Sequence, residues 1–156
     1  MYKLSALLFL VSALFASAGC TPDSSAHVIH PNGDTTKCLD VRGAVFANGT
    51  PVQIFDCNGS NAQMWDIMPG TTTVKVHNFD FCLDAGSTPG NFIGMKIWEC
   101  FDGLPAQTWF YTGDQRIALL NQGLCLDLTN GLHVNSNQVQ TYACTDGNTN
   151  QVWHLD

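Results

Sequence analysis

The stretch TNQVWHL at residues 149–155 lies near the C-terminus and contains the tripeptide Gln-x-Trp. Two earlier stretches repeat it, NAQMWDI at 61–67 and PAQTWFY at 105–111. Only the last copy has Asn directly before the Gln, whereas the other two have Ala. This pattern indicates two roles: constant positions that build the fold, and a varied position that helps decide which copy binds a ligand.

Two further markers recur with the same period. The tripeptide Cys-Leu-Asp begins at residues 38, 82 and 125, and a second Cys follows at 57, 100 and 144. All three markers keep one order and recur every 43 or 44 residues. A period of this length is typical of an architecture built from repeated units. We therefore place three repeats at about 27–70, 71–114 and 115–156.

Each repeat is expected to form four short strands. Several segments alternate apolar and polar residues, and turn residues such as Asn, Gly, Asp and Pro separate them. The expected strands are 27–30, 37–42, 51–57 and 63–67, then 73–78, 81–86, 94–100 and 107–112, then 116–121, 124–129, 138–144 and 151–156.

One unit of four strands cannot bury its own apolar face. Three units that close around a pseudo-threefold axis can, and closure also removes exposed sheet edges. A propeller has similar units but typically needs at least about four of them. The sequence therefore predicts an all-β protein with the β-trefoil fold.

The N-terminus has the pattern of a secretory signal peptide. Lys3 precedes an apolar run over 4–15, and the small residues that follow predict cleavage after Ala18. The run is too short to cross a bilayer, which needs roughly 20 apolar residues. We expect a signal peptide at 1–18, a short linker at 19–26 and one domain at 27–156, in a secreted, extracellular protein. A retained anchor and a lipoprotein signal at Cys20 are the alternatives.

The charge disfavours two classes of partner. The formal net charge is −7, with six Lys and Arg in 156 residues. Nucleic acids and anionic membrane surfaces are bound by cationic patches, so neither is expected. No segment after the N-terminal run is apolar enough for membrane insertion.

Six of the seven Cys fall as one pair in each repeat, and Cys20 is left over. Six Cys allow fifteen connectivities. The repeat favours the connectivity that joins the second expected strand to the third. Zinc is the rival interpretation, but no CxxC or His pair lies beside these Cys, and disulfides suit an exported protein. The expected disulfides are Cys38–Cys57, Cys82–Cys100 and Cys125–Cys144.

The three copies of Gln-x-Trp, each after a Cys-Leu-Asp and a second Cys, closely resemble the ricin B-chain-like lectins. These are β-trefoils that are also classed as carbohydrate-binding modules, and the resemblance covers about 27–156. It implies that the three Trp fill a shared core and that the three Gln brace turns by hydrogen bonds. The residues concerned are Trp65, Trp109, Trp153, Gln63, Gln107 and Gln151.

The resemblance also implies a sugar site in each repeat. The Asp of Cys-Leu-Asp accepts hydrogen bonds from two hydroxyls, and an aromatic two positions before the second Cys stacks on the sugar ring. A polar residue two positions before that aromatic, and an Asn before the Gln-x-Trp Gln, complete the contacts. A carboxylate beside an aromatic ring suits a hexose, which has hydroxyls on its rim and an apolar C–H face.

The three repeats match this pattern unequally. The third repeat carries the full set, and the first lacks the Asn, because Ala62 stands there. The second has Lys96 and Ala106 at the two polar positions, so we rank the sites third, first, second. The alternative for these Asp is a purely local role in stabilising loops. The candidate residues are Asp127, Gln140, Tyr142, Asn150 and Gln151, then Asp40, Gln53 and Phe55, then Asp84 and Trp98.

The chain also contains two sequons and a pair of His residues. Asn48 and Asn58 head Asn-Gly-Thr and Asn-Gly-Ser, which are N-glycosylation sequons in an exported protein. His27 and His30 lie three apart on an expected strand, so their side chains point to opposite faces and no metal site is expected.

The sequence does not support catalysis. It has a single Glu, Glu99, and no nucleophile elbow, phosphate loop or zinc helix motif. We therefore expect no catalytic residues, no metal and no cofactor. The expected function is non-covalent binding of galactose, lactose, GalNAc or xylan-type glycans. A secreted trefoil that binds or inhibits another protein is the alternative, and the sequence leaves the oligomeric state open.

Overall fold

The computed structural model describes residues 26–156. The described chain consists of short strands and five 3₁₀ turns. No helix in this part of the chain is long and apolar enough to cross a bilayer. The predicted signal peptide at 1–18, most of the linker at 19–26 and Cys20 lie outside the described residues.

The strands follow the predicted order, with additional short ones. The first repeat contains β1 (Ala26–His27), β2 (Ile29–Pro31), β3 (Lys37–Val41), η1 (Arg42–Ala44), β4 (Val52–Asp56), η2 (Asn61–Gln63) and β5 (Trp65–Asp66). The second contains β6 (Gly70–Thr72), β7 (Lys75–Val76), β8 (Phe81–Asp84), β9 (Ile93–Gly94), β10 (Lys96–Glu99), η3 (Pro105–Gln107) and β11 (Trp109–Tyr111). The third contains β12 (Ile117–Leu119), β13 (Leu124–Asp127), η4 (Thr129–Gly131), β14 (Asn137–Gln138), β15 (Gln140–Ala143), η5 (Thr149–Gln151) and β16 (Trp153–Leu155).

One detail differs from the expected strands. The Gln of each Gln-x-Trp ends a 3₁₀ turn, and the strand begins only at the Trp. The buried Gln amide makes the difference, because it bonds to backbone groups of the preceding loop. In the first repeat, Gln63 Oε1 accepts the Asn58 N–H at 2.8 Å, and its Nε2 donates to the Asp56 carbonyl at 3.0 Å.

A hairpin in each repeat places the candidate Asp opposite a polar residue. The hairpins are β3–β4, β8–β10 and β13–β15, and all are antiparallel. Their registers pair Asp40 with Gln53, Asp84 with Lys96 and Asp127 with Gln140. The three predicted disulfides, Cys38–Cys57, Cys82–Cys100 and Cys125–Cys144, are present and tie these hairpins together.

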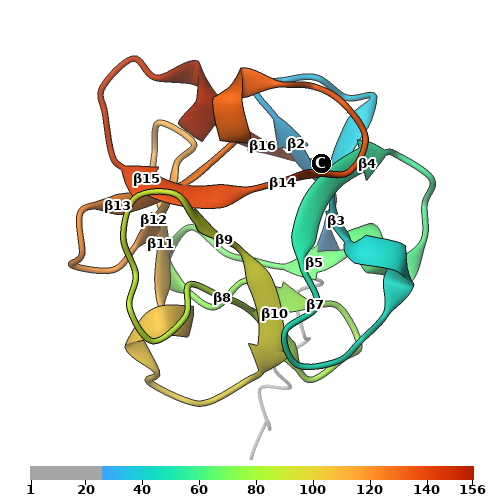
Figure 1. Ribbon diagram of the computed structural model, residues 1–156, viewed down its shortest axis with the longest axis horizontal. Coiled ribbons are helices and arrows are strands. Elements are labelled where there is room, and N and C mark those ends of the chain that lie inside the picture. Colours follow the sequence, from blue (N-terminus) through green and yellow to red (C-terminus); the bar gives the residue numbers. More distant parts are fainter. Residues whose placement is uncertain (1–25) are drawn as a thin grey trace, which may run out of the picture.

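The three repeats surround a common axis, as the β-trefoil prediction requires. In Figure 1, β4, β10 and β15 lie in three lobes around the centre of the view. The ring is closed where β2 near the N-terminus pairs with β16 at the C-terminus. The β-trefoil fold is thus confirmed.

The Gln-x-Trp tryptophans build the core. Trp65, Trp109 and Trp153 are fully buried in one hydrophobic cluster. Each indole N–H donates to the carbonyl of the Leu in its repeat's Cys-Leu-Asp, at 2.9–3.0 Å. This bond satisfies the buried indole nitrogen and fixes the Asp that follows the Leu.

Candidate functional site

Four of the five candidate residues of the third repeat, Asp127, Gln140, Tyr142 and Asn150, line one surface hollow of about 280 Å³. Asp127 ends β13, and Gln140 begins β15 directly opposite it. Gln140 Nε2 donates to Asp127 Oδ1 at 3.0 Å. Tyr142 follows two residues along β15, so it shares the face of Gln140. The alternation of the hairpin therefore brings a carboxylate, an amide and an aromatic ring together.

Buried hydrogen bonds fix Asp127, which is 4% exposed. Gln151 Nε2 donates to Asp127 Oδ2 at 3.2 Å and to the Ala143 carbonyl at 3.0 Å, while its Oε1 accepts the Thr145 N–H at 2.9 Å. Gln151 is fully buried and does not line the hollow. Its place in the structure is behind Asp127, where it orients the carboxylate.

Asn150 and Tyr142 are two of the residues that offer open polar groups in the hollow. Neither side chain hydrogen-bonds with any residue that the structure describes, so the Asn150 amide and the Tyr142 hydroxyl remain available to a ligand. Asn150 is held close to η4, where a Cβ on Gly131 would lie 2.8 Å from Asn150 Oδ1. Glycine at 131 therefore makes room for Asn150 in the site.

The first repeat forms a similar hollow of about 320 Å³. Asp40 accepts from Gln53 Nε2 at 2.9 Å and from Gln63 Nε2 at 3.0 Å. Phe55 lines the hollow as the aromatic. Arg42 Nε donates to Gln53 Oε1 at 2.7 Å, so the amide oxygen that the third repeat leaves open is already occupied here.

Asp40 differs in its ionisation as well. Burial raises the pKa of Asp40 above its ordinary value, and the amide hydrogen bonds from Gln53 and Gln63 offset part of that increase. On acidification, Asp40 is therefore expected to become protonated at a higher pH than an exposed Asp does.

The missing Asn of the first repeat is not replaced by its neighbour. Ala62 lines the hollow at 2% exposure, and Asn61 does not line it. Asn58 and Ser60 do. The predicted sequon at Asn58 thus lies at the rim of the first hollow, whereas Asn48 lies on an exposed loop with its Oδ1 accepting the Glu99 N–H at 2.7 Å.

The second repeat uses its carboxylate internally. Asp84 Oδ1 accepts the Gly86 N–H at 2.7 Å and lies 3.4 Å from Lys96 Nζ. Gln107 Nε2 donates to Asp84 Oδ2 at 3.0 Å. Asp84 therefore bonds to the backbone of its own loop, and it also lines a hollow of about 320 Å³ in the second repeat. Trp98 is 37% exposed and lines the hollow of the second repeat. Lys96 Nζ lies 6.0 Å from the centroid of the Trp98 ring.

Three residues that line the third hollow escaped the sequence pattern: Asn130, Asn148 and Phe92. Asn148 Nδ2 donates to Asp127 Oδ2 at 3.4 Å, and its Oδ1 accepts the Asn150 N–H at 3.1 Å. The corresponding positions are Ser60 and Leu104, so no repeat signal marks Asn148. Phe92 also lines this hollow although it belongs to the second repeat. Only the tertiary structure reveals that placement.

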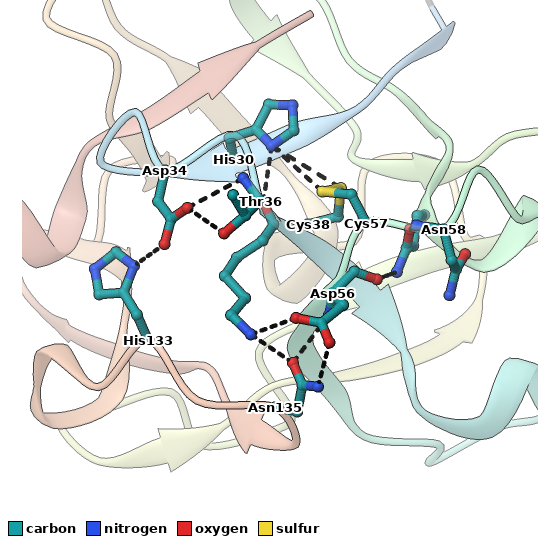
Figure 2. A network of polar contacts seen from close by, with 11 residues as sticks. His30, Asp34, Thr36, Cys38, Asp56, Cys57, Asn58, His133 and Asn135 are labelled. Atoms are coloured by element: carbon teal, nitrogen blue, oxygen red, sulfur yellow. Dashed lines mark hydrogen bonds and ion pairs between the residues drawn. A yellow bond between two sulfur atoms is a disulfide. The ribbon is translucent and has the colours of Figure 1, made fainter.

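His30 lies beside a disulfide and not beside free thiols. Its Nδ1 donates to the Lys37 carbonyl at 2.7 Å and lies 3.9 and 3.7 Å from the sulfur atoms of Cys38 and Cys57 (Figure 2). These three residues, within the described part of the chain, place potential metal-ligand atoms within 4.8 Å of one another. The two sulfur atoms are bonded to each other, so neither offers the thiolate that a metal needs.

Known proteins resemble this chain in sequence family and in fold. The family of the ricin-type beta-trefoil lectin domain matches residues 26–153. No curated protein matches the chain in sequence.

Solved structures match over most of the chain. The designed threefold-symmetric protein ThreeFoil has a TM-score of 0.74 and 21% identity, over 84% of this chain and 97% of ThreeFoil. The C-half of the earthworm R-type lectin, solved with GalNAc, has a TM-score of 0.69 and 19% identity, over 84% and 97%. GalNAc-T7, solved with UDP, GalNAc and Mn²⁺, has a TM-score of 0.64 and 24% identity, but the match covers 22% of that longer chain. These likenesses establish the shared fold, and the family match over 26–153 shows that the chain belongs to the ricin-type β-trefoil lectin domain family.

Proposed function

We propose that this protein is a secreted lectin that binds galactose-type or related glycans non-covalently, chiefly through its third repeat. The observation that carries the proposal is the third hollow. There the Asp127 carboxylate, the Gln140 amide and the open Asn150 amide line the same hollow as the Tyr142 ring. This arrangement offers hydrogen bonds to a sugar's hydroxyls and an apolar surface to its C–H face.

The arrangement of carboxyl groups favours binding over catalysis. In the described chain, each of the three hollows is lined by one carboxyl group, from Asp40, Asp84 or Asp127. Glycoside hydrolysis generally needs two carboxyl groups that flank the bond. Glu99 lies exposed at the end of β10 and lines none of these hollows.

Secretion is proposed on the N-terminal sequence and is supported by the three disulfides, which persist in oxidising compartments. Expression of the full chain in a secreting host, followed by N-terminal sequencing of the protein in the medium, tests it. The expected first residue is Gly19. Retention of the whole chain in the cell would contradict the proposal.

The binding proposal is tested on a glycan array with four proteins: wild type and the variants Asp127→Asn, Asp40→Asn and Asp84→Asn. Asn keeps the shape of the side chain but removes the charge and one acceptor. We expect wild type to bind galactose-terminated glycans, Asp127→Asn to lose most of the signal, and Asp84→Asn to behave as wild type.

Three outcomes would contradict parts of the proposal. Loss only in Asp40→Asn would move the main site to the first repeat. Binding confined to xylan-type glycans would reject the galactose preference. A folded wild-type protein that binds no glycan would reject the lectin and favour the protein-binding alternative.

A further inference from the structure

Phe92 belongs to the second repeat, but it is an exposed aromatic residue that lines the hollow of the third. Its side chain is 71% exposed, yet it lines the hollow beside Asp127 and Tyr142. The ring centroids of Phe92 and Tyr142 lie 5.0 Å apart at an interplanar angle of 73°. The two rings therefore form a corner at one side of the hollow.

The loop that carries Phe92 is fixed against the third repeat. The Phe92 N–H donates to the Thr141 carbonyl at 2.9 Å, and the Thr141 hydroxyl donates to the Gly90 carbonyl at 2.7 Å. Asn91 Oδ1 accepts the Ala143 N–H at 2.8 Å. The strand β9 that follows pairs with β15, beside which it lies in Figure 1. The backbone of Phe92 is thus positioned before any ligand arrives.

The same loop occurs in all three repeats, which makes Phe92 stand out. Gly49 and Ser136 occupy the equivalent positions, since their N–H groups donate to the Ile97 and Ile54 carbonyls in the same way. All three residues have a positive φ, of 88° at Gly49, 65° at Phe92 and 68° at Ser136. A bulky residue is rarely found at such a φ, because the conformation strains the backbone. Strained residues of this kind cluster at functional sites.

We propose that the third site is a composite site for a disaccharide or larger glycan, in which Phe92 packs against the second sugar. This inference rests on the proposed function and names the ligand class of that site. A sugar stacked on Tyr142 between Asp127 and Asn150 has the Phe92 ring at its side and not over its face. Phe92 therefore meets the group that is linked to the first sugar, and its apolar ring suits the C–H face of a second sugar.

The geometry also predicts that the other two sites lack this extension. Gly49 lies beside Trp98 at the second site without a side chain, and Ser136 offers a small hydroxymethyl group at the equivalent place next to β4. The first and second sites should therefore distinguish poorly between a single sugar and a longer chain.

The test compares Phe92→Ala with wild type by calorimetric titration of two probe pairs. The pairs are methyl β-galactoside with lactose, and xylose with xylotriose. Phe110→Ala serves as the control, because Phe110 is an exposed Phe on β11 that lines none of the three hollows. We expect Phe92→Ala to lower the affinity for the longer probe of the bound pair by about fivefold and the affinity for the monosaccharide by less than about twofold. Phe110→Ala should change neither.

The results separate the two proposals. If wild type binds a pair and Phe92→Ala weakens both members equally, or neither, the composite site is wrong while the lectin stands. If folded wild type binds neither pair, the lectin proposal fails and the composite site fails with it. Ser136→Phe provides the converse check, because it places a Phe beside the first site. In a protein that also carries Asp127→Asn, Ser136→Phe should strengthen binding of the longer probe at the first site.

Discussion

At the scale of single residues, Asn150 distinguishes the third repeat from the other two. Its side chain makes no hydrogen bond within the described chain, whereas the Ala at the equivalent positions offer no polar group. We therefore expect Asn150 to serve the site and not the fold, in contrast to the adjacent Gln151, which is buried and fully bonded.

Asn150→Ala should weaken glycan binding by about five- to tenfold, the equivalent of one hydrogen bond of about 1 kcal/mol. The unfolding free energy should stay within about 0.5 kcal/mol of wild type, as expected for a side chain with no internal partner. Titration calorimetry and thermal melts measure the two quantities. Asn61→Ala, an exposed Asn outside the first hollow, is the matched control, and a large loss of stability in Asn150→Ala would contradict this separation of roles.

Gly131 supports Asn150 in a way that a pair of variants can isolate. Gly131 and Gly123 both have positive φ, of 64° and 66°, but only at Gly131 does an added Cβ meet the Asn150 side chain. Gly131→Ala and Gly123→Ala should each cost about 1 kcal/mol of stability from the backbone conformation. Only Gly131→Ala should also reduce glycan affinity, because it displaces Asn150. Equal affinities in the two variants would show that Asn150 does not contribute.

At the scale of elements, the hairpin β13–β15 is the unit that positions the third site. The registers place Asp127 opposite Gln140, and the disulfide Cys125–Cys144 joins the same two strands. The indole N–H of Trp153 holds the Leu126 carbonyl from the core side at 3.0 Å. Each repeat uses this construction, with a connection one residue shorter between the paired Cys of the second repeat.

Removal of any one of the three disulfides should therefore lower the stability of the protein, but only removal of the disulfide in the third repeat should also weaken binding. The double variant Cys125→Ala/Cys144→Ala should lose about 3 kcal/mol of unfolding free energy, as estimated for a loop of this length. Cys82→Ala/Cys100→Ala should lose a similar amount. Denaturant unfolding and glycan titration measure both, and we expect weaker binding only in the first variant. Weaker binding of equal size in both would place the main site elsewhere.

At the scale of the whole molecule, polar contacts between the first and third repeats help to close the ring. Asn135 of the third repeat accepts from Lys37 Nζ at 2.7 Å and donates from Nδ2 to Asp56 Oδ2 at 2.8 Å, and it thereby joins the ion pair that Lys37 and Asp56 form within the first repeat (Figure 2). Nearby, His133 Nδ1 lies 2.8 Å from Asp34 Oδ2. These contacts lie beside the pairing of β2 with β16, where the two ends of the described chain meet.

These contacts predict a dependence of stability on acid. Hydrogen bonds from Lys37 and Asn135 lower the pKa of Asp56, and that of Asp34 is lowered chiefly by its hydrogen bond from Thr36 and also by His133. A carboxyl group whose pKa is lower in the folded state stabilises the fold above its unfolded pKa. That contribution is lost as the pH falls through the folded pKa.

The melting temperature should therefore fall as the pH is lowered from about 5 to about 2. The fall should be smaller in Asp56→Asn, which retains an acceptor for Lys37 but cannot take up a proton. Asp102→Asn, at an exposed Asp, should follow the wild-type curve. Thermal melts across this range check the prediction, and an Asp56→Asn curve parallel to wild type would contradict it.

The repeated markers determined the fold from the sequence. Gln-x-Trp and the Cys pairs recur because each copy performs the same structural task, so the number of units, the disulfides and the buried Trp follow from the pattern. The grouping of Asp127 with Gln140 and Tyr142 was also predictable, since strand alternation and the hairpin bring them to one face.

Only the tertiary structure decided what surrounds those residues. Closure of the ring brings Phe92 of the second repeat to the third site, and contacts between repeats of this kind leave no periodic trace when Gly49 and Ser136 stand at the equivalent positions. The way in which Gln151 is buried behind Asp127, with its amide fully bonded, likewise depends on atoms that the sequence pattern does not place. A periodic sequence specifies what its repeats share, whereas packing between the repeats specifies how one site comes to differ from the others.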